Sequence, residues 1–155
     1  MNFIQAQSAS EINEARALFQ QYEADLGISL CFQDFSQEVD NLPGEYALPD
    51  GRLLLIRDED TTAGCIALRK IGERLCEMKR LYVRPEFRGR GVGRMLTERI
   101  IEEARKLNYD RMRLDTLPGR MENAIKLYRS LGFQEVPAYY HNPVPEAIYM
   151  ELRLV

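Results

Sequence analysis

One segment near the middle of the chain, residues 76–107, constrains the fold more than any other part of the sequence. Its letters, CEMKRLYVRPEFRGRGVGRMLTERIIEEARKL, predict a strand, a short loop with proline and glycine, and an amphipathic helix. Counting Arg94, the loop places three glycines and three arginines at the point where the helix begins. A helix start offers free backbone N–H groups and the positive end of the helix dipole. The segment therefore predicts an anion site, and we expect the anion to be the pyrophosphate of a nucleotide-containing cofactor.

Length and composition predict an ordinary globular protein. The 155 residues suit one domain, so we expect residues 1–155 to form a single domain. The chain is 45% hydrophobic and 29% charged, with a net charge of -3. This mildly acidic balance argues against broad nucleic-acid binding, which relies on excess lysine and arginine. We expect no nucleic-acid partner, although the local arginine cluster between Arg84 and Arg94 keeps a nucleic-acid contact as a weaker alternative.

Cysteine and histidine usage argues against a metal site. Cys31, Cys65 and Cys76 are widely spaced and form neither a disulfide framework nor a C-x-x-C pair. The sole histidine, His141, is far from all three in sequence. No signal-peptide pattern opens the chain, and no apolar run reaches about 20 residues. We therefore expect a cytoplasmic protein with no metal and no membrane partner.

The hydrophobic periodicity predicts alternating strands and helices. A capping-box spacing at Ser8 and Glu11 announces the first helix, which Gly27 ends. The apolar run Leu53–Ile56 indicates a strand that is covered on both faces. The expected strands are 3–6, 51–57, 62–69, 76–83, 111–116, 133–136 and 148–154. One expected helix follows Ser8, one follows the glycine loop and runs to Leu107, and two others span 31–42 and 121–131. This order predicts an α/β or α+β fold, with helices packed on a mixed sheet.

The strand at 76–83 has an irregular alternation. Cys76 and Met78 alternate with polar residues, but the next apolar positions are Leu81 and Val83, so the parity changes. A β-bulge near Lys79–Arg80 would repair the register, and bulges often lie beside active sites. The alternative is a strand without a bulge in which the Tyr82 face is also buried.

The glycine loop does not fit the two common nucleotide-binding motifs. A dinucleotide fingerprint needs G-x-G-x-x-G after the first strand, but Arg94 occupies the sixth position and the motif lies in mid-chain. A phosphate-binding loop of the form G-x-x-x-x-G-K-[ST] is absent from the sequence. The loop does contain R-x-x-G-x-G, formed by Arg88, Gly91 and Gly93.

This motif resembles that of the GNAT superfamily of acyl-CoA-dependent N-acyltransferases. A second segment, Ala124–Phe133, is similar to that family's pattern N-x-x-A-x-x-L-Y-x-x-x-G-F. Met121 stands where the family often has asparagine, and Asn123 lies two positions further on. The resemblance is close from Glu77 to Phe133.

The resemblance implies a mostly antiparallel central sheet with helices on both faces. It also implies that acetyl-CoA lies between two splayed parallel strands, here 76–83 and 111–116. A homodimer through the last strands is compatible with it. The residues that it assigns to the cofactor are Leu81, Tyr82, Val83, Arg88, Gly89, Arg90, Gly91, Val92, Gly93, Arg94 and Asn123. Backbone N–H groups of the loop would hold the pyrophosphate, and backbone groups of Leu81 and Val83 would bond the pantetheine arm and polarise the thioester carbonyl.

Two side chains are implied as catalytic. Tyr128 matches the family's general acid, which protonates the departing thiolate; the alternative is a core tyrosine. Glu77 stands where several members carry a general base, and the alternative is an exposed glutamate paired with Lys79 or Arg113. His141 is a further candidate for the base, as is water.

We therefore expect an N-acetyltransferase that acetylates a primary amine, preferably of a small molecule, in a ternary complex. The alternatives are a non-catalytic acyl-CoA-binding regulator and a protein N-terminal or lysine acetyltransferase. Acceptor specificity should depend on residues 26–42 and 137–145. Arg111, Arg113 and Arg120 are candidates for recognising a carboxylate on the acceptor.

Overall fold

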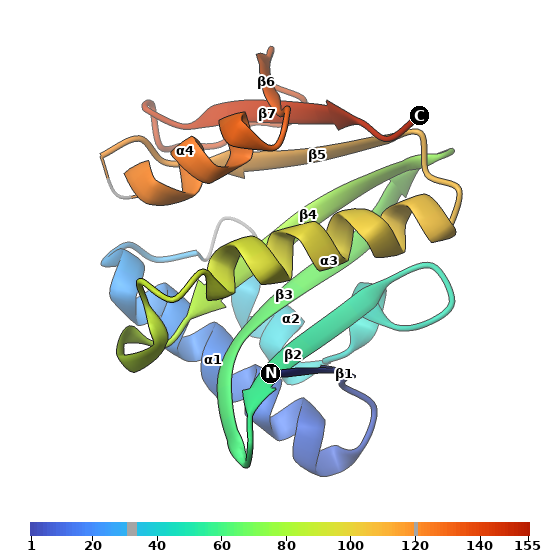
Figure 1. The fold of residues 1–155 in the computed structure, drawn as a ribbon. Helices are drawn as coiled ribbons and strands as arrows, with labels where there is room; N and C mark the ends of the chain where they lie inside the picture. Colours follow the sequence, from blue (N-terminus) through green and yellow to red (C-terminus); the bar gives the residue numbers. More distant parts are fainter. Residues whose placement is uncertain (31–33, 120) are drawn as a thin grey trace.

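The computed structural model describes residues 1–30, 34–119 and 121–155. The predicted start of the second helix at Cys31 and the candidate carboxylate ligand Arg120 lie outside these residues. Figure 1 shows the elements in chain order. They are β1 (Asn2–Gln5), α1 (Ala9–Leu26), α2 (Phe35–Asp40), η2 (Gly44–Tyr46), β2 (Arg52–Asp58), β3 (Thr61–Gly72), β4 (Leu75–Val83), η3 (Pro85–Phe87), α3 (Val92–Lys106), β5 (Arg111–Thr116), α4 (Glu122–Ser130), β6 (Gln134–Val136) and β7 (Ile148–Arg153).

The strands form one sheet in the order β1-β2-β3-β4-β5-β7-β6. Its neighbouring strands are antiparallel except for β4 and β5, which are parallel. The expected strands 51–57 and 62–69 are present as β2 and β3, which pair as an antiparallel hairpin around the turn at residues 59–60. The predicted mixed, mostly antiparallel sheet with one parallel pair is confirmed.

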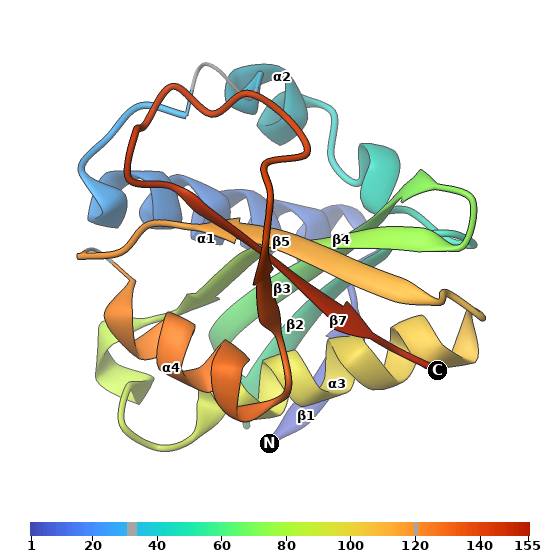
Figure 2. The same cartoon turned by 90° about the horizontal axis from the view of Figure 1, so that it is seen from above.

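Helices cover both faces of this sheet. Figure 2 shows α1 and α2 on one side and α3 and α4 on the other. The run Leu53–Ile56 serves both layers: Leu53 and Leu55 pack into the cluster with α1 and α2, while Leu54 and Ile56 pack into the cluster with α3. The prediction that this strand is covered on both faces is confirmed.

The long helix α3 is amphipathic, as predicted, and faces the sheet with an apolar stripe. Leu96, Ile100 and Ala104 are fully buried, and Leu107 packs against the same cluster. The spacing i, i+4, i+8 and i+11 keeps these side chains on one face of a helix with 3.6 residues per turn. The stripe fixes the start of α3 beside the end of β4.

The parallel pair separates after a short contact. In the part of the chain that the structure describes, β4 and β5 pair at Leu75–Arg111, Cys76–Met112 and Glu77–Arg113, and the ladder ends there. Both strands continue beyond this point, β4 to Val83 and β5 to Thr116, and Figure 1 shows them diverging. The backbone edge of β4 that faces β5 is therefore left without a strand partner along residues 78–83.

A β-bulge lies in β4 where the strands diverge. Between the pairs Cys65–Tyr82 and Ala67–Lys79, β3 advances by two residues and β4 by three, so β4 holds one extra residue. Arg80 has φ +61°, a left-handed conformation that is uncommon for residues other than glycine. The bulge predicted near Lys79–Arg80 is confirmed.

Candidate active site

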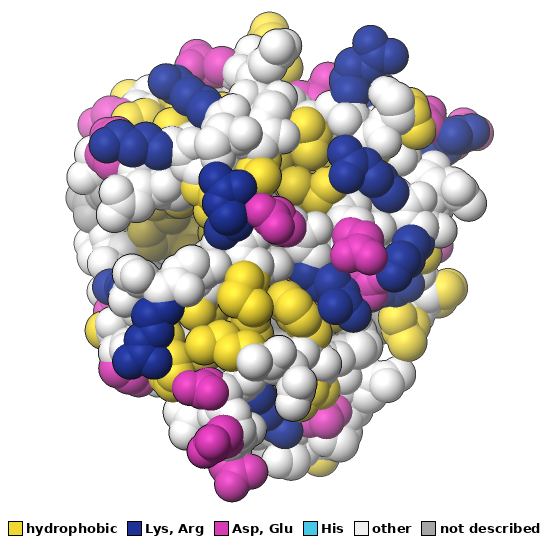
Figure 3. Space-filling view, in the orientation of Figure 1, with side chains coloured by type: hydrophobic (Ala, Val, Ile, Leu, Met, Phe, Trp, Pro, Cys, Tyr) yellow, Lys and Arg dark blue, Asp and Glu magenta, His cyan; other side chains and the backbone are white. Residues whose placement is uncertain are grey.

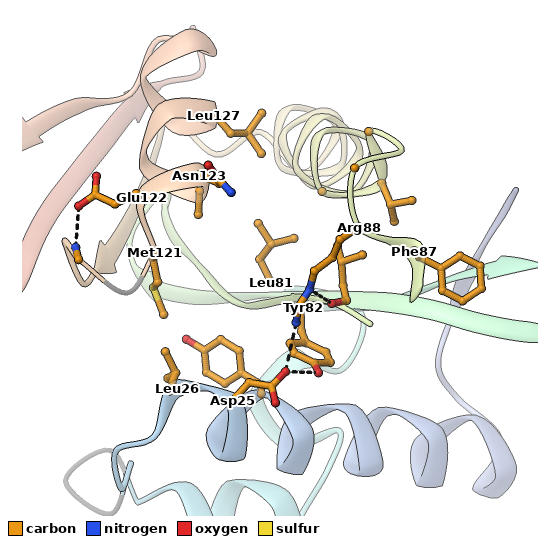
Figure 4. Close-up of a pocket in the computed structure, with 18 residues that line it drawn as sticks. Asp25, Leu26, Leu81, Tyr82, Phe87, Arg88, Met121, Glu122, Asn123 and Leu127 are labelled. Carbon is orange, nitrogen blue, oxygen red and sulfur yellow. Dashed lines mark hydrogen bonds and ion pairs between the residues drawn. The ribbon is translucent and has the colours of Figure 1, made fainter. Parts of the chain in front are cut away.

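A cavity of about 550 Å³ lies where the start of α3, the end of β4, the end of α1 and α4 meet. Figure 3 shows a recess below α4, and Figure 4 shows the side chains around the cavity. The described lining residues include Tyr22, Asp25 and Leu26 of α1, Leu81, Tyr82 and Val83 of β4, Arg88, Gly89, Gly91, Val92 and Gly93 of the loop and α3, and Met121, Asn123 and Leu127 beside or on α4. Four separate parts of the chain thus enclose one space.

The start of α3 has no side-chain cap. Gly91 is the N-cap residue, it makes no side-chain cap bond, and the first turn carries no acidic residue. The first bond of the helix runs from Met95 N to Gly91 O at 3.0 Å, so the N–H groups before Met95 have no helical acceptor. By contrast, α1 has the predicted capping box between Ser8 and Glu11. The free N–H groups and the helix dipole make the start of α3 a site for an anion.

Two glycines give the loop before α3 its shape. Gly89 and Gly91 have φ +79° and +77°, values that L side chains rarely adopt. A Cβ built on either residue would meet no heavy atom within 4 Å, because both positions face open space. The loop therefore leaves room for a bulky anion against its backbone, which fits the diphosphate of a CoA molecule.

The arginines of the loop make different contacts. Arg88 donates from Nε to the carbonyl of Val83 at 2.9 Å and from Nη2 to Asp25 Oδ2 at 3.1 Å. Tyr82 Oη donates to the same oxygen of Asp25 at 2.5 Å, as the dashed lines in Figure 4 show. Arg90 stacks its guanidinium 5.4 Å from the centre of the Phe87 ring, and Arg94 bonds to Glu98 and Ser130. Arg88 thus lines the cavity, whereas Arg90 and Arg94 are not among its lining residues.

Asn123 lies on the wall opposite Leu81. In Figure 4 its side chain and that of Leu127 reach from α4 toward the cavity. The N-cap of α4 is Met121, with no side-chain cap bond. Asn123 therefore does not cap this helix and is open to contact a ligand.

A second, smaller cavity of about 40 Å³ lies between the diverging strands. It shares Tyr22, Leu26, Leu81 and Met121 with the large cavity, so the two adjoin. Tyr128 lines the small cavity and packs against Phe133, with ring centres 5.7 Å apart. Burial raises the pKa of Tyr128, so its hydroxyl stays protonated at neutral pH. The Tyr128 side chain thus lies at the small cavity with its hydroxyl protonated.

Glu77 lies in a polar cluster on the α1–α2 side of the sheet. It is 1% exposed, and its Oε1 accepts from Arg69 Nε at 2.8 Å. Its Oε2 accepts from Tyr139 Oη at 2.7 Å, and Lys79 Nζ lies 3.9 Å from Oε1. The alternative of an exposed glutamate is therefore wrong, and Arg69 is its main partner.

Lys79 and Arg80 bring positive charge to the small cavity. Both are buried and both line it. Arg80 binds the carboxylate of Glu38 in α2 through two bonds of 2.8 and 2.9 Å. Burial, followed by the charge of Arg80, lowers the pKa of Lys79. The bulge in β4 is what presents these two consecutive residues on the same side.

The loop before β7 covers this polar side. Asp115, on β5, accepts from Tyr140 Oη and from Asn142 Nδ2, the latter at 3.1 Å. Figure 2 shows residues 137–147 arching over the same side of the sheet as α2. His141, in this loop, is exposed. Arg111 and Arg113 both pair with Glu151, at 3.4 and 2.8 Å, so their charges are shared with a partner in β7.

Comparison with known proteins places this architecture in a family. Residues 14–133 match the model of the acetyltransferase (GNAT) family. An uncharacterized N-acetyltransferase of Schizosaccharomyces pombe is 42% identical over 146 residues, which cover 93% of this chain and 89% of the relative. The chain belongs to the acetyltransferase (GNAT) family.

Solved GNAT structures share the fold. An acetyltransferase of this family from Staphylococcus aureus superposes with a TM-score of 0.82, at 19% identity and 99% coverage of both chains. An acetyltransferase from Salmonella typhimurium, whose structure includes its cofactor acetyl-CoA, gives a TM-score of 0.73 at 20% identity, covering 100% of this chain and 94% of that one. The predicted fold and enzyme class, an acyl-CoA-dependent N-acetyltransferase of the GNAT family with acetyl-CoA as co-substrate, are confirmed.

Several site residues of this GNAT protein carried no recognisable sequence signal. Tyr22 and Asp25 reach the large cavity from α1, and Asp115 reaches the small one from β5. Their positions depend on packing between distant segments.

Among the described residues, no group of three or more His, Cys, Asp or Glu side chains could hold a metal ion. No helix in the described ranges combines the length and apolar character needed to cross a membrane.

Proposed function

We propose that this GNAT protein transfers the acetyl group of acetyl-CoA to the primary amine of a small molecule by direct attack in a ternary complex. The observation that carries the proposal is the pair of adjoining cavities. The larger one lies at an uncapped helix start, and the smaller one lies between diverging strands beside Tyr128.

The chain's own groups fit the parts of acetyl-CoA, which supplies an activated acetyl group as a thioester. The free N–H groups at the start of α3 would hold the pyrophosphate. The unpaired edge of β4 along residues 78–83 would bond the pantetheine arm, and Leu81 lines both cavities at that edge. Asn123 would contact the arm from α4. Arg88 fixes the Val83 carbonyl and would support the loop.

Tyr128 is proposed as the general acid. Its raised pKa would keep the proton on the hydroxyl until the thiolate departs, and its place at the small cavity supports a position beside the reacting groups. Glu77 is the base that the sequence predicts, but Arg69 and Tyr139 hold its two oxygens. An ammonium acceptor must lose a proton before it can attack, so a base is required near neutral pH.

The covered acceptor side favours a small molecule. Residues 137–147 are tied to the sheet by the bonds of Tyr139 to Glu77 and of Tyr140 to Asp115. The space left between the strands is about 40 Å³, which suits a compact amine better than a protein segment.

The free, buried thiols of Cys65 and Cys76 support a cytoplasmic location. The continuous sheet supports one domain over residues 1–155, and the exposed edge at β6 supports a homodimer through the last strands.

The proposal is tested by incubating the purified protein and acetyl-CoA with alkylamines, diamines, amino acids and amino sugars. We expect CoA release and an acetylated product, detected by mass spectrometry, for at least one small amine. Acetylation of peptides alone would favour a protein acetyltransferase. Acetyl-CoA binding without transfer to any amine or peptide would favour a non-catalytic regulator.

A further inference from the structure

The small cavity between β4 and β5 contains a carboxylate. Among the described residues that line it, Asp115 is the only acidic one. Asp115 is the fifth residue of β5, beyond the last pair of the parallel ladder, and therefore lies on the diverging part of the strand. The wall of the same cavity includes Tyr128, the proposed general acid.

The loop before β7 holds Asp115 in a defined orientation. Tyr140 Oη and Asn142 Nδ2 both donate to Oδ2, and neither of these bonds uses Oδ1. The two donors are themselves fixed: Tyr149 Oη donates to the carbonyl of Tyr140 at 2.9 Å, and Val144 N donates to Asn142 Oδ1 at 2.9 Å. A carboxylate oriented through one oxygen can receive a ligand at the other.

Glu77 is in a different position. Arg69 occupies one of its oxygens and Tyr139 the other, and the residue is 1% exposed. It is not part of the wall of either cavity described above. A general base needs an oxygen within hydrogen-bond reach of the proton that it removes. By this criterion Asp115 is better placed than Glu77.

Titratable side chains from several elements of the cavity wall surround Asp115. Lys79 and Arg80 lie on β4, Tyr22 on α1, Tyr128 on α4, and Tyr140 in the loop. Glu38 neutralises Arg80, and Glu77 lies 3.9 Å from Lys79 Nζ. The cationic side chains near Asp115 therefore have other carboxylate partners. Asp115 can then bind the ammonium group of the acceptor.

Resting on the proposed function, we infer that Asp115 binds the ammonium group of the acceptor and takes up its first proton. A nitrogen–hydrogen bond breaks and an oxygen–hydrogen bond forms on Asp115. The freed nitrogen lone pair then forms the carbon–nitrogen bond, while the carbon–sulfur bond breaks and its electron pair goes to sulfur. Tyr128 gives sulfur a proton. The second proton that the nitrogen loses replaces the one given by Tyr128, and the first passes from Asp115 to solvent.

The test compares kcat/KM against pH for the wild type, Asp115→Asn and Glu77→Gln, using the amine that the panel identifies as the best acceptor. We expect D115N to lose about 100-fold or more in kcat/KM near pH 7. Part of this loss in kcat/KM should be recovered as the pH is raised toward the pKa of the free amine, because the unprotonated amine needs no base. In E77Q, the fall of kcat/KM at low pH should have the same midpoint as in the wild type. Asp110→Asn, which loses only the surface pair with Arg74, is the matched control with wild-type kinetics.

Two further measurements exclude loss of structure. The Kd for acetyl-CoA and the thermal unfolding midpoint of D115N should stay close to wild type. If D115N does not fold, Asp115→Ala with added formate is used instead, and formate should restore activity in a concentration-dependent way. Wild-type kinetics in D115N, or a shifted acid limb in E77Q alone, would overturn the inference and leave the proposed function intact. A wild type that acetylates no amine would instead overturn the proposed function, and this inference with it.

Discussion

Tyr128 and Tyr109 are both buried tyrosines, but their hydroxyls have different surroundings. Tyr109 Oη donates to the carbonyl of Asp50 at 2.7 Å. Tyr128 lines the small cavity, together with Leu81 and Asp115. Burial raises the pKa of both side chains, so both are protonated at neutral pH. Position rather than protonation state therefore distinguishes Tyr128, the proposed proton donor, from Tyr109.

Replacing Tyr128 with Phe removes this donor and keeps the ring that packs against Phe133. We expect kcat to fall by about 100-fold or more, with little change in the Kd for acetyl-CoA, because general acids typically contribute this much. Steady-state kinetics and calorimetric titration measure the two quantities. Tyr109→Phe is the matched control and should lose about 1 kcal/mol of unfolding free energy while keeping kcat. An unchanged kcat in Y128F would remove Tyr128 from the mechanism.

The two long helices differ at their first turns, and this difference follows from local sequence. Ser8 and Glu11 cap α1, whereas glycine and arginine precede α3 without a capping side chain. Such features could be predicted because they depend on residues within a few positions of one another. The bulge at Arg80 was predictable for the same reason. The contacts of Arg90 and Arg94 could not be predicted, because the partners of a long side chain depend on which residues the tertiary structure brings near it.

Substitution at Gly91 tests the start of α3 as the anion site. Gly91→Ala places a Cβ on a residue with φ +77°, facing open space in the cavity wall. We expect the Kd for acetyl-CoA to rise about tenfold or more, equivalent to ~1.4 kcal/mol of binding free energy. Gly44 also has a positive φ, +48°, with nothing within 4 Å, but it lies in η2. Gly44→Ala should share the backbone strain and leave the Kd unchanged; equal effects of both variants on the Kd would contradict this account.

At the scale of the whole molecule, the sheet buries groups that local patterns leave in doubt. The local sequence is equally compatible with an exposed and a buried Glu77. In the structure, Arg69 on β3 and Tyr139 in the last loop bond to its carboxylate. These partners are 8 and 62 residues away in sequence. Asp115 likewise depends on Tyr140 and Asn142. Long-range pairs of this kind form the proposed acceptor side. The sequence therefore indicates the cofactor more clearly than the acceptor.

The buried sheet also predicts alkaline instability. Burial raises the pKa of Cys65 and of Cys76 from 9.0 to about 12. Between these values the unfolded thiols ionise and the folded ones do not, so the folded state binds more protons and stability falls as the pH rises from 9 to 12. Each thiol contributes up to ~1.4 kcal/mol per pH unit. Denaturant unfolding should show a shallower decline for the double variant Cys65→Ala, Cys76→Ala; parallel declines would contradict the assignment. Lys79 and the tyrosines titrate in both proteins and cancel in the difference.

Amide hydrogen exchange with and without acetyl-CoA tests the central claim most directly, namely that the cofactor lies between the start of α3 and the open edge of β4. The account predicts slower exchange at residues 89–94 and 78–83 when acetyl-CoA is bound. It also predicts little change at the start of α1, where Ser8 already caps the helix. Unchanged exchange at residues 89–94, with protection elsewhere, would contradict the placement of the site.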